Sequence, residues 1–203
     1  MVIPREPFDK TQGYSHERNR KGRRRDYTRA PQITKAYLLG ILHDSTVRKT
    51  TYRLGTKSKI FAKIIKRGIE RLSSNKAWIY KEGKDRNLWI IEFSKSLLKN
   101  FEIVSKQNKI DYIRGFFDAE GGIAKNPKVR FYLYFCQKDK KVLEQVKNYL
   151  AEFGLFSGVI HNPSYRVDSN YWRFYIKAKS YKNFINLISS SHPEKLSILR
   201  MKI

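Results

Sequence analysis

Two carboxylates occupy corresponding places in two similar segments of the chain. The first segment, ITKAYLLGILHDST at 33–46, carries Asp44 near its end. The second segment, NKIDYIRGFFDAEGG at 108–122, carries Glu120 near its end. In both segments an aromatic residue, a glycine and two apolar residues precede the acid at helical spacing. Each segment is therefore expected to form a helix that ends at its carboxylate.

Each expected helix also contains a glycine, Gly40 in the first and Gly115 in the second. A glycine inside a helix costs about 1 kcal/mol relative to alanine, so it usually marks the close approach of another backbone. Two helices packed at their glycines would bring Asp44 and Glu120 together. Neighbouring carboxylates on a basic protein are costly unless a cation or a proton separates them. Oxygen ligands suit Mg²⁺ bound jointly to phosphate, an arrangement that cleaves phosphodiesters.

The similarity between the two segments continues in the elements that follow them. Residues 51–72 predict an alternating strand, a turn and an amphipathic helix, and residues 131–154 predict the same order. The strand pattern NLWIIEF at 87–93 then matches NYWRFYI at 170–176. We therefore expect two related halves, each with the order helix, strand, strand, helix, strand, strand, helix.

The start of the repeat also sets the expected division of the chain. Residues 32–107 would form the first half and residues 108–203 the second half of an α+β fold. Residues 1–31 show neither helical nor strand periodicity and hold the run RNRKGRRR at 18–25. Two interpretations of this basic N-terminal arm stay open: a solvated tail or localisation signal, and an arm that lies along phosphates and becomes ordered on binding.

The expected strands of the second half have one apolar face and one basic and aromatic face. Apolar residues alternate with Arg or Tyr in the run Arg130, Phe131, Tyr132, Leu133, Tyr134 and Phe135. The same alternation runs from Tyr171 to Ile176. A solvated strand face usually mixes both charge signs, whereas Arg and Tyr dominate here. That composition is typical of a surface that binds nucleic acid.

The overall charge favours a polyanionic partner. The 203 residues include 43 Lys and Arg against 18 Asp and Glu, a formal net charge of +25, and 40% are hydrophobic, which is enough for a core. Nucleic acid is the first partner to consider, because neutralised phosphates release counterions, and an anionic membrane surface is the second. The chain shows no apolar run near the ~18 residues of a membrane span. The N-terminal MVIPREPFDK lacks the apolar segment of a signal peptide.

The cysteine and histidine content excludes several kinds of site. The single Cys136 excludes a disulfide framework and a cysteine-rich zinc site, and the four histidines show no metal-ligand spacing. Any metal would therefore be held by oxygen. We expect a reducing, intracellular and cytoplasmic location with access to DNA.

The two helix segments resemble the signatures of a known family. DYIRGFFDAEGG is similar to the second signature of the LAGLIDADG homing endonucleases, and AYLLGILHDST is similar to the first signature in a divergent form. The resemblance runs from about Ile33 to the C-terminus. It implies a monomer of two pseudo-symmetric αββαββα halves, whose saddle-shaped antiparallel sheets lie in successive major grooves of DNA. It also implies a metal-dependent double-strand break in a long, asymmetric DNA target, as in intron homing.

The resemblance further implies roles for individual residues. Four of them would hold Mg²⁺ or Mn²⁺, two through carboxylates and two through main-chain carbonyls: Asp44, Glu120, His43 and Ala119. Gln137 and Lys195 would act with the two acids in catalysis, beside the scissile phosphates. Lys109 is the weaker candidate for the corresponding basic residue of the first half.

The first signature departs from the family pattern. Counted from Gly40, Asp44 stands at position seven rather than eight, so we infer one deleted residue before the acid. Thr56 stands where the second half has Gln137. Without that deletion the first site would lack its carboxylate, and the protein would nick or only bind DNA. The ring of His43 would then be the alternative ligand.

The residues expected to contact DNA lie in the arm, on the strands and in the neighbouring turns: Arg23, Arg24, Arg25, Arg48, Arg53, Lys57, Lys128, Arg130, Tyr132, Tyr134, Lys138 and Arg173. Two alternatives stay open on the same scaffold, an RNA maturase that binds intron RNA and a DNA-binding protein that does not cleave. The paired acids favour the nuclease, because RNA binding alone needs no carboxylate pair. No basic amphipathic helix outside the expected core suggests membrane attachment.

Overall fold

The computed structural model describes residues 32–74, 76–83, 86–124, 126 and 128–201. The basic N-terminal arm, with the expected DNA contacts Arg23, Arg24 and Arg25, lies outside these residues. Within the described part of the chain, no helix has the length and apolar character needed to cross a bilayer.

The first half contains one antiparallel sheet and the helices packed against it. In chain order its elements are α1 (Lys35–Ile41), the 3₁₀ turn η1 (Leu42–Asp44), β1 (Ser45–Val47), β2 (Thr51–Thr56), α2 (Lys59–Leu72), β3 (Ala77–Lys81), β4 (Trp89–Ser94) and the 3₁₀ turn η2 (Lys95–Leu98). The strands follow the order β1-β2-β4-β3. The helix expected at the end of this half is only the short turn η2, because the backbone turns away at Asn100, whose φ is +57°.

The second half repeats this plan with one irregular strand. Its elements are α3 (Lys106–Glu120), β5 (Gly121–Ile123), β6 (Leu133–Gln137), α4 (Lys140–Glu152), β7 (Trp172–Tyr175), the 3₁₀ turn η3 (Ala178–Ser180), α5 (Tyr181–Leu187) and α6 (Pro193–Arg200). The sheet order is β5-β6-β7. The expected fourth strand pairs only through two isolated bridges, Ser157 with Ile176 and His161 with Arg173. Pro163, two residues after His161, has no N–H to donate, so the pairing does not continue through it.

Side-chain caps fix where the helices begin. The hydroxyl of Thr34 accepts the N–H of Tyr37 at 3.1 Å at the start of α1, and Ser58 caps α2 in the same way. Ser105 forms a reciprocal capping box with Asn108 at the start of α3. Such caps satisfy N–H groups that the first turn of a helix leaves without partners. The first residues of α1, α2 and α3 follow from these local signals.

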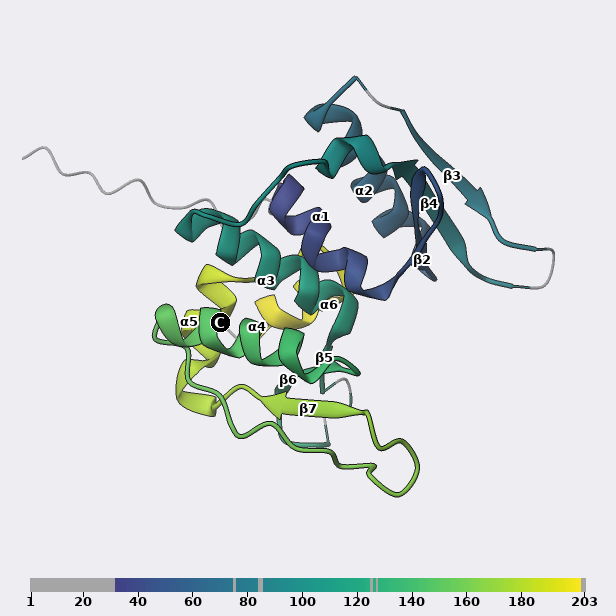
Figure 1. Cartoon of the computed structure of the whole chain (residues 1–203). Coiled ribbons are helices and arrows are strands. Elements are labelled where there is room, and N and C mark those ends of the chain that lie inside the picture. Colours follow the sequence, from purple (N-terminus) through teal and green to yellow (C-terminus); the bar gives the residue numbers. More distant parts are fainter. Residues whose placement is uncertain (1–31, 75, 84–85, 125, 127, 202–203) are drawn as a thin grey trace, which may run out of the picture.

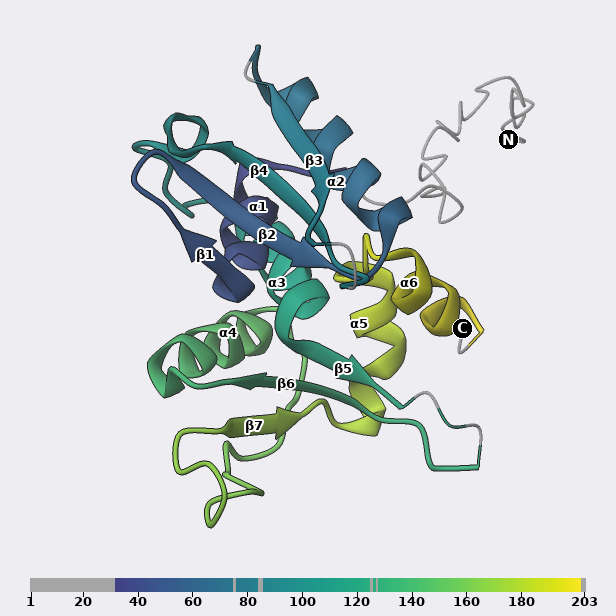
Figure 2. The ribbon, with the colours of Figure 1, turned by 90° about the vertical axis from the view of Figure 1, so that its right-hand side faces the viewer.

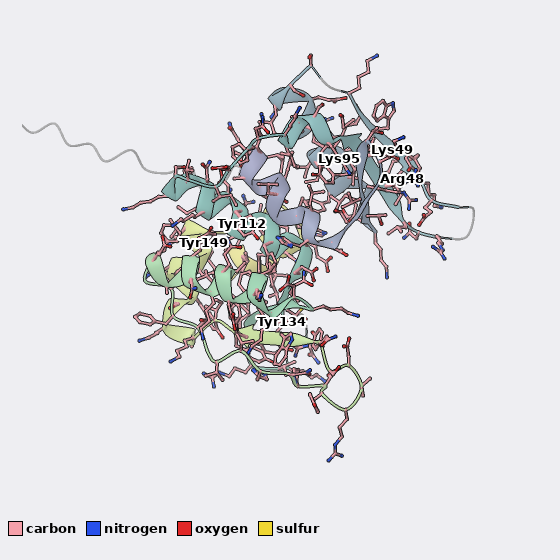
Figure 3. All side chains as sticks on the ribbon, in the orientation of Figure 1. Arg48, Lys49, Lys95, Tyr112, Tyr134 and Tyr149 are labelled. Atoms are coloured by element: carbon pink, nitrogen blue, oxygen red, sulfur yellow. The ribbon has the colours of Figure 1, made fainter. Side chains whose placement is uncertain are left out.

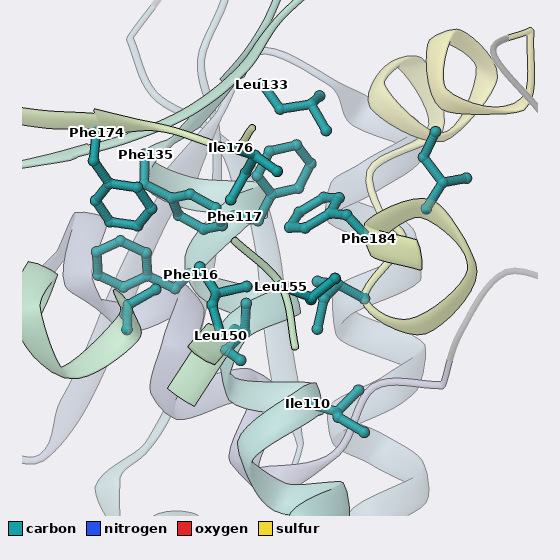
Figure 4. Close-up of a cluster of buried hydrophobic side chains, with 14 of the residues drawn as sticks. Ile110, Phe116, Phe117, Leu133, Phe135, Leu150, Leu155, Phe174, Ile176 and Phe184 are labelled. Atoms are coloured by element: carbon teal, nitrogen blue, oxygen red, sulfur yellow. The ribbon is translucent and has the colours of Figure 1, made fainter. Parts of the chain in front are cut away.

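Each half has its own apolar core. The core of the second half is rich in phenylalanine, as Figure 4 shows for Phe116, Phe117, Phe135, Phe174 and Phe184. The rings of Phe135 and Phe174 stack with centroids 5.2 Å apart, and those of Phe117 and Phe184 meet edge-on at 5.1 Å. The core of the first half is mostly aliphatic and lies between its sheet and helices α1 and α2. α3 therefore belongs to the second core and α1 to the first.

Helices α1 and α3 lie side by side and join the halves (Figure 1). A Cβ at Gly40 would lie 2.1 Å from the carbonyl oxygen of Tyr112, and a Cβ at Gly115 would lie 2.0 Å from that of Tyr37. The glycine contact is therefore reciprocal, as the repeat predicts, and a side chain at either position would overlap backbone. The prediction of an α+β fold with two related halves is confirmed. In Figure 2 the two sheets lie one above the other, with the end of α3 between them.

Candidate active site

Two helix ends bring Asp44 and Glu120 to the junction of the halves. α3 stays α-helical from Gly115 to Glu120. α1 gives way after Ile41 to the 3₁₀ turn η1, which ends at Asp44. A 3₁₀ turn rises about 2.0 Å per residue against about 1.5 Å in an α-helix, so both paths from glycine to acid rise about 7.5 Å. The tighter turn thus makes up for the shorter spacing of the first signature.

The Glu120 carboxyl is half-buried and held by a neighbouring strand. The side-chain amide of Gln137, at the end of β6, donates to Oε1 of Glu120 at 2.9 Å. Burial, and to a lesser degree the charge of Asp44, raise the pKa of the Glu120 carboxyl to about 7, against the opposing effects of Gln137 and Lys195. A second carboxylate that raises the pKa of Glu120 in this way favours a cation between the two acids.

Asp44 lies at the wall of a cavity between the halves. Partial burial raises the pKa of its carboxyl, and the ammonium group of Lys195 opposes that rise. The cavity has a volume of about 380 Å³, and its polar lining includes Asp44, Thr56, Asp118, His192, Glu194 and Lys195. The hydroxyl of Thr56 accepts the N–H of Ser58 at 3.2 Å, so this side chain supports a turn in the first half. The first site therefore has no counterpart to the bond from Gln137 to Glu120 among the described hydrogen bonds.

Lys195 supports the end of α3. Its Nζ donates to the carbonyl oxygens of Phe117, Asp118 and Gly121 at 2.6, 2.9 and 2.7 Å. A lysine has three N–H donors, and a cation at the C-terminus of a helix also interacts favourably with the helix dipole. The predicted catalytic lysine thus binds backbone oxygens next to Glu120 in this structure.

Two other residues singled out in the sequence lie away from the cavity. Nε2 of His43 lies 2.7 Å from the hydroxyl of Tyr112, and its ring packs edge-on against Phe116 with centroids 5.0 Å apart. The ring is therefore engaged by α3 in this structure, and metal binding through it stays an untested prediction. Lys109 pairs with Glu152 at 2.6 Å near the start of α3. It lies eleven residues before Glu120, about 16 Å along the helix, and does not belong to the site.

Asp118 ties the helix pair to the C-terminal segment. Its buried carboxylate accepts the hydroxyl of Tyr37 at 2.7 Å, the N–H of Ser191 at 2.8 Å and the hydroxyl of Ser190. These partners come from α1 and from the segment before α6. Asp118 is therefore a hydrogen-bonding group at the end of α3, and it links the two halves.

The oxygen atoms at this junction suit a hard divalent cation. Among the carbonyls at the end of α3, those of Phe117, Asp118 and Gly121 accept Lys195, and that of Glu120 faces the thiol of Cys136 at 3.1 Å. Ala119 is not among these acceptors. The described residues include no cluster of three or more His, Cys, Asp or Glu that could hold a metal alone. The donors fit Mg²⁺ or Mn²⁺ in a site completed by water and phosphate.

The outer face of the second sheet presents an arginine among tyrosines. Arg173 donates to the hydroxyl groups of Tyr175 and Tyr171 at 3.1 and 2.6 Å. Its guanidinium lies 4.5 Å from the ring centre of Tyr134, which Figure 3 places on this sheet. The ring of Tyr132 packs 6.0 Å from that of Tyr134. The expected alternation therefore holds, and it produces a rigid cationic surface that the sequence pattern could not specify beyond its residue types.

The outer face of the first sheet is less uniformly basic than expected. Arg53 pairs with Glu82, and Nη1 of Arg48 lies 3.8 Å from Glu92. Sequence reasoning missed both glutamates. The alternation in NLWIIEF could have placed Glu92 on the outer face, whereas Glu82 lies just beyond β3 and carries no periodic signal.

The remaining expected contacts lie on the surface around the two sheets. Arg48, Lys49 and Lys95 gather near one end of the first sheet (Figure 3), where the N–H of Lys95 donates to the carbonyl of Thr50. Four further cations are exposed in turns or loops: Lys57, Lys128, Arg130 and Lys138. Lys138 pairs with Asp168 at 3.5 Å.

Comparisons of sequence indicate one family. Residues 107–189 match the family model of the LAGLIDADG-like domain. An uncharacterized protein of Methanocaldococcus jannaschii is 26% identical over 198 residues, which cover 84% of this chain and 70% of that protein. The resemblance expected from the signatures is confirmed for the second half by the family match.

Comparisons of structure extend the likeness to both halves. The homing endonuclease I-DmoI in complex with DNA and Mn is 25% identical, with a TM-score of 0.58 over 78% of this chain and 97% of that one. Its complex with DNA and Ca gives a TM-score of 0.60. The N-terminal LAGLIDADG domain of DUF199/WhiA has a TM-score of 0.62 over 85% of this chain and 91% of that domain. At 16% identity the last likeness concerns the fold alone.

Proposed function

We propose that this chain, which has the fold of LAGLIDADG proteins and matches their family model in its second half, is a site-specific DNA endonuclease. It would make a metal-dependent double-strand break in a long, asymmetric duplex target, as a monomer. The proposal rests on one observation above all. Asp44 and Glu120 end two helices packed at reciprocal glycines, and these carboxyls share a junction between two sheets.

Different residues of this chain would bind the duplex and position the catalytic acids. The outer faces of the two sheets would hold the duplex, with Arg173 and the tyrosines around it in the second half. Gln137 fixes the orientation of the Glu120 carboxylate through its hydrogen bond. Lys195 braces the backbone that carries Glu120 and adds a positive charge near both acids. Each strand would then be cut next to one acid.

Asp44 and Glu120, with the carbonyls of His43 and Ala119, are the residues that would hold Mg²⁺ or Mn²⁺. When bound, such a cation would act as a Lewis acid and stabilise the negative charge that develops on the phosphate. The complexes of I-DmoI with Mn and with Ca support a divalent ion in proteins of this fold. Between Mg²⁺ and Mn²⁺, the oxygen donors of this chain allow either.

A second function is favoured by one difference between the two sites. The Asp44 site lacks the amide that holds Glu120, because Thr56 supports a turn instead. A protein with one weak site would nick one strand slowly, or would bind DNA without cutting it. Intron RNA binding, as in a maturase, would use the same basic sheets.

The test is selective cleavage of a duplex library. Linear duplexes with a randomised central region are incubated with the full chain in Mg²⁺ or Mn²⁺, and fragments with new ends are sequenced. We expect one family of sequences to be cut in both strands. Asp44→Asn and Glu120→Gln should each abolish the double-strand break while binding to the selected duplex stays within about threefold, because both changes keep shape and remove charge.

The controls separate the alternatives. Glu152→Gln, which removes a surface carboxylate paired with Lys109, should cut like the parent chain. Binding of selected duplexes with no cut strand in either metal would identify a DNA-binding protein. A cut in one strand only, unaffected by Asp44→Asn, would show that the first site is inactive. Enrichment of structured RNA but of no duplex would favour the maturase.

A further inference from the structure

A chain of hydrogen-bonded side chains crosses the outer face of the first sheet. The hydroxyl of Thr51 donates to Oε1 of Glu92 at 2.6 Å, and the hydroxyl of Tyr80 donates to Oε2 at 2.8 Å. Nε of Arg53 in turn donates to the Tyr80 hydroxyl at 3.3 Å, and its Nη2 donates to Glu82. These residues come from β2, β3, β4 and the segment after β3. Two of them, Tyr80 and Glu82, bond the Arg53 side chain directly.

The geometry of these bonds leaves one end of the Arg53 guanidinium for a ligand. The group carries five N–H donors in a planar fork. The edge formed by Nε and Nη2 is used by Tyr80 and Glu82. No described hydrogen bond uses Nη1, so the Nη1–Nη2 end still presents two parallel donors. Two parallel N–H groups are what the O6 and N7 atoms of guanine accept in the major groove.

The charge around Arg53 argues against a role in phosphate binding. Its side chain is 19% exposed and pairs with Glu82, which is 23% exposed, so a carboxylate offsets its positive charge. The side chains of Arg86 and Arg48 are more exposed, at 76% and 53%. Their guanidinium groups form longer ion pairs, Arg86 with Glu82 at 3.6 Å and Arg48 with Glu92 at 3.8 Å. A paired guanidinium contributes less to the neutralisation of phosphates but keeps its directional donors. That combination suits contact with a base edge better than contact with the backbone.

The position of Arg53 relates it to the proposed cleavage site. A groove of about 360 Å³ on this face is lined by Asp44, Thr46, Arg53, Gly55, Glu82, Arg86, Leu88 and Ile90. Arg53 and the acid of the first half therefore open onto one groove. Gly55, two residues after Arg53 on β2, also lines this groove and has no side chain that would fill it. A base pair seated over Arg53 would lie close to the phosphate at Asp44.

We propose that Arg53 is a specificity-determining residue that reads one guanine near the cut made at Asp44, and that Glu82 is its positioning residue. This inference rests on the proposed function, since it requires duplex DNA on the outer face of the first sheet. Glu82 acts through Arg53 by holding its fork in one orientation. The first sheet would thus supply base discrimination that the basic residues around it do not.

The experiment compares base preference and salt dependence of binding. Duplexes selected from the randomised library by the full chain are bound in Ca²⁺ by the parent, Arg53→Lys, Glu82→Gln and the matched control Arg67→Lys, which changes an exposed arginine of α2 away from this groove. Arg53→Lys keeps the positive charge but removes the planar guanidinium group and its parallel N–H donors. We expect it to reduce the preference for guanine at one position roughly tenfold or more. Glu82→Gln should relax the same position, and Arg67→Lys should leave the preference profile unchanged.

The salt dependence distinguishes a base contact from a phosphate contact. If Arg53 reads a base, Arg53→Ala should keep the slope of log affinity against log salt, whereas loss of a phosphate contact would lower its magnitude by about 1. If the parent chain selects a duplex target and Arg53→Lys keeps the same guanine preference, this inference is overturned while the proposed function stands. Failure of the parent chain to enrich any duplex would overturn the inference together with the proposed function.

Discussion

At the scale of single residues, the site depends on carboxyl groups kept partly out of water. Glu120 holds a proton to higher pH than a free glutamate because it is half-buried and faces Asp44. The amide of Gln137 and the ammonium of Lys195 limit that effect without cancelling it. In the absence of a cation, this group is therefore a cost to the folded state at neutral pH, which a bound cation would relieve.

A pH series of thermal unfolding in chelator tests this property of Glu120. Because the folded-state pKa of about 7 exceeds that of the unfolded chain, the native state binds a proton that the unfolded state releases. The free energy of unfolding should thus fall as pH rises from roughly 4.5 to 7 and stay lower above that window. Glu120→Gln should remove this loss. Since Glu120 is only half-buried, solvent screening reduces the gain to about 1 kcal/mol, or roughly 2–4 °C in Tm at pH 8.

A substitution at another glutamate is the control for Glu120→Gln. Glu152→Gln removes a surface carboxylate of the same half and should leave the dependence of Tm on pH as it is in the parent chain. At pH 4.5 or below, Glu120→Gln and the parent chain should unfold within about a degree of each other. Equal Tm values at pH 8 as well would mean that the Glu120 pKa is not raised in solution.

Residue types and spacing predicted the positions of the two acids, but not the contacts of the side chains that orient them or change their pKa. Asp44 and Glu120 follow from the repeat, because each ends a helix with its own local signal. The contacts of Lys195 with the end of α3 join residues more than seventy positions apart, so no local pattern indicates them. The pairing of Arg53 with Glu82 likewise depends on the way the segment after β3 folds over the sheet.

At the scale of elements, the pair α1 and α3 sets the spacing of the site. A Cβ at Gly40 or Gly115 would overlap backbone atoms of the other helix at 2.0–2.1 Å, where no side chain can move aside. The helices would have to separate, and the acids at their ends would separate with them. The contact between the glycines was predictable because a glycine in the middle of a helix usually marks the close approach of another backbone. The repeat indicates that this backbone is the other helix.

Gly40→Ala and Gly115→Ala test this packing. Overpacking costs about 1–3 kcal/mol and more where backbone must shift, whereas alanine in a helix returns about 1 kcal/mol. We expect a net loss of about 2–4 kcal/mol and a fall in Tm of roughly 5–15 °C, measured by calorimetry. Gly158→Ala is the control, since its Cβ would meet only the Tyr175 carbonyl at an ordinary 3.7 Å. A Gly115→Ala variant as stable as the control would show that the helices do not pack as described.

Elements without such a local marker were predicted less well. The fourth strand of the second sheet was expected from the repeat, but only two bridges form before Pro163. The last helix of the first half shrinks to η2, since the backbone conformation at Asn100 redirects the chain into α3. Both departures arise where one connecting residue, rather than a periodic pattern, decides the path of the backbone.

At the scale of the whole molecule, the dominant feature is the positive net charge. The salt dependence of DNA binding tests whether this charge serves to bind phosphates. Nine of the 43 basic residues lie in the basic N-terminal arm, so most of the surplus belongs to residues 32–203. Exposed cations flank both sheets, and each phosphate that they neutralise adds about 0.9 to the slope magnitude of log affinity against log salt. Contacts from both sheets predict a magnitude of about 5 or more for residues 32–203, measured by fluorescence anisotropy on a selected duplex. A magnitude below about 3 would leave too few contacts for an interface that spans two sheets.

The basic N-terminal arm should add to this affinity without taking part in the chemistry. Its run at 18–25 holds six basic residues and no carboxylate, and it precedes α1, which leads through η1 to Asp44. The tether keeps these charges at high effective concentration near phosphates that flank the target. Removal of residues 1–31 should weaken binding at moderate salt and lower the slope magnitude, while the cleavage rate of saturated complex stays within about twofold, because none of the groups around Asp44 and Glu120 is lost. Equal affinity of the truncated and full chains across the salt series would identify the arm as an inert tail, and a collapse of cleavage at saturation would place it at the active site.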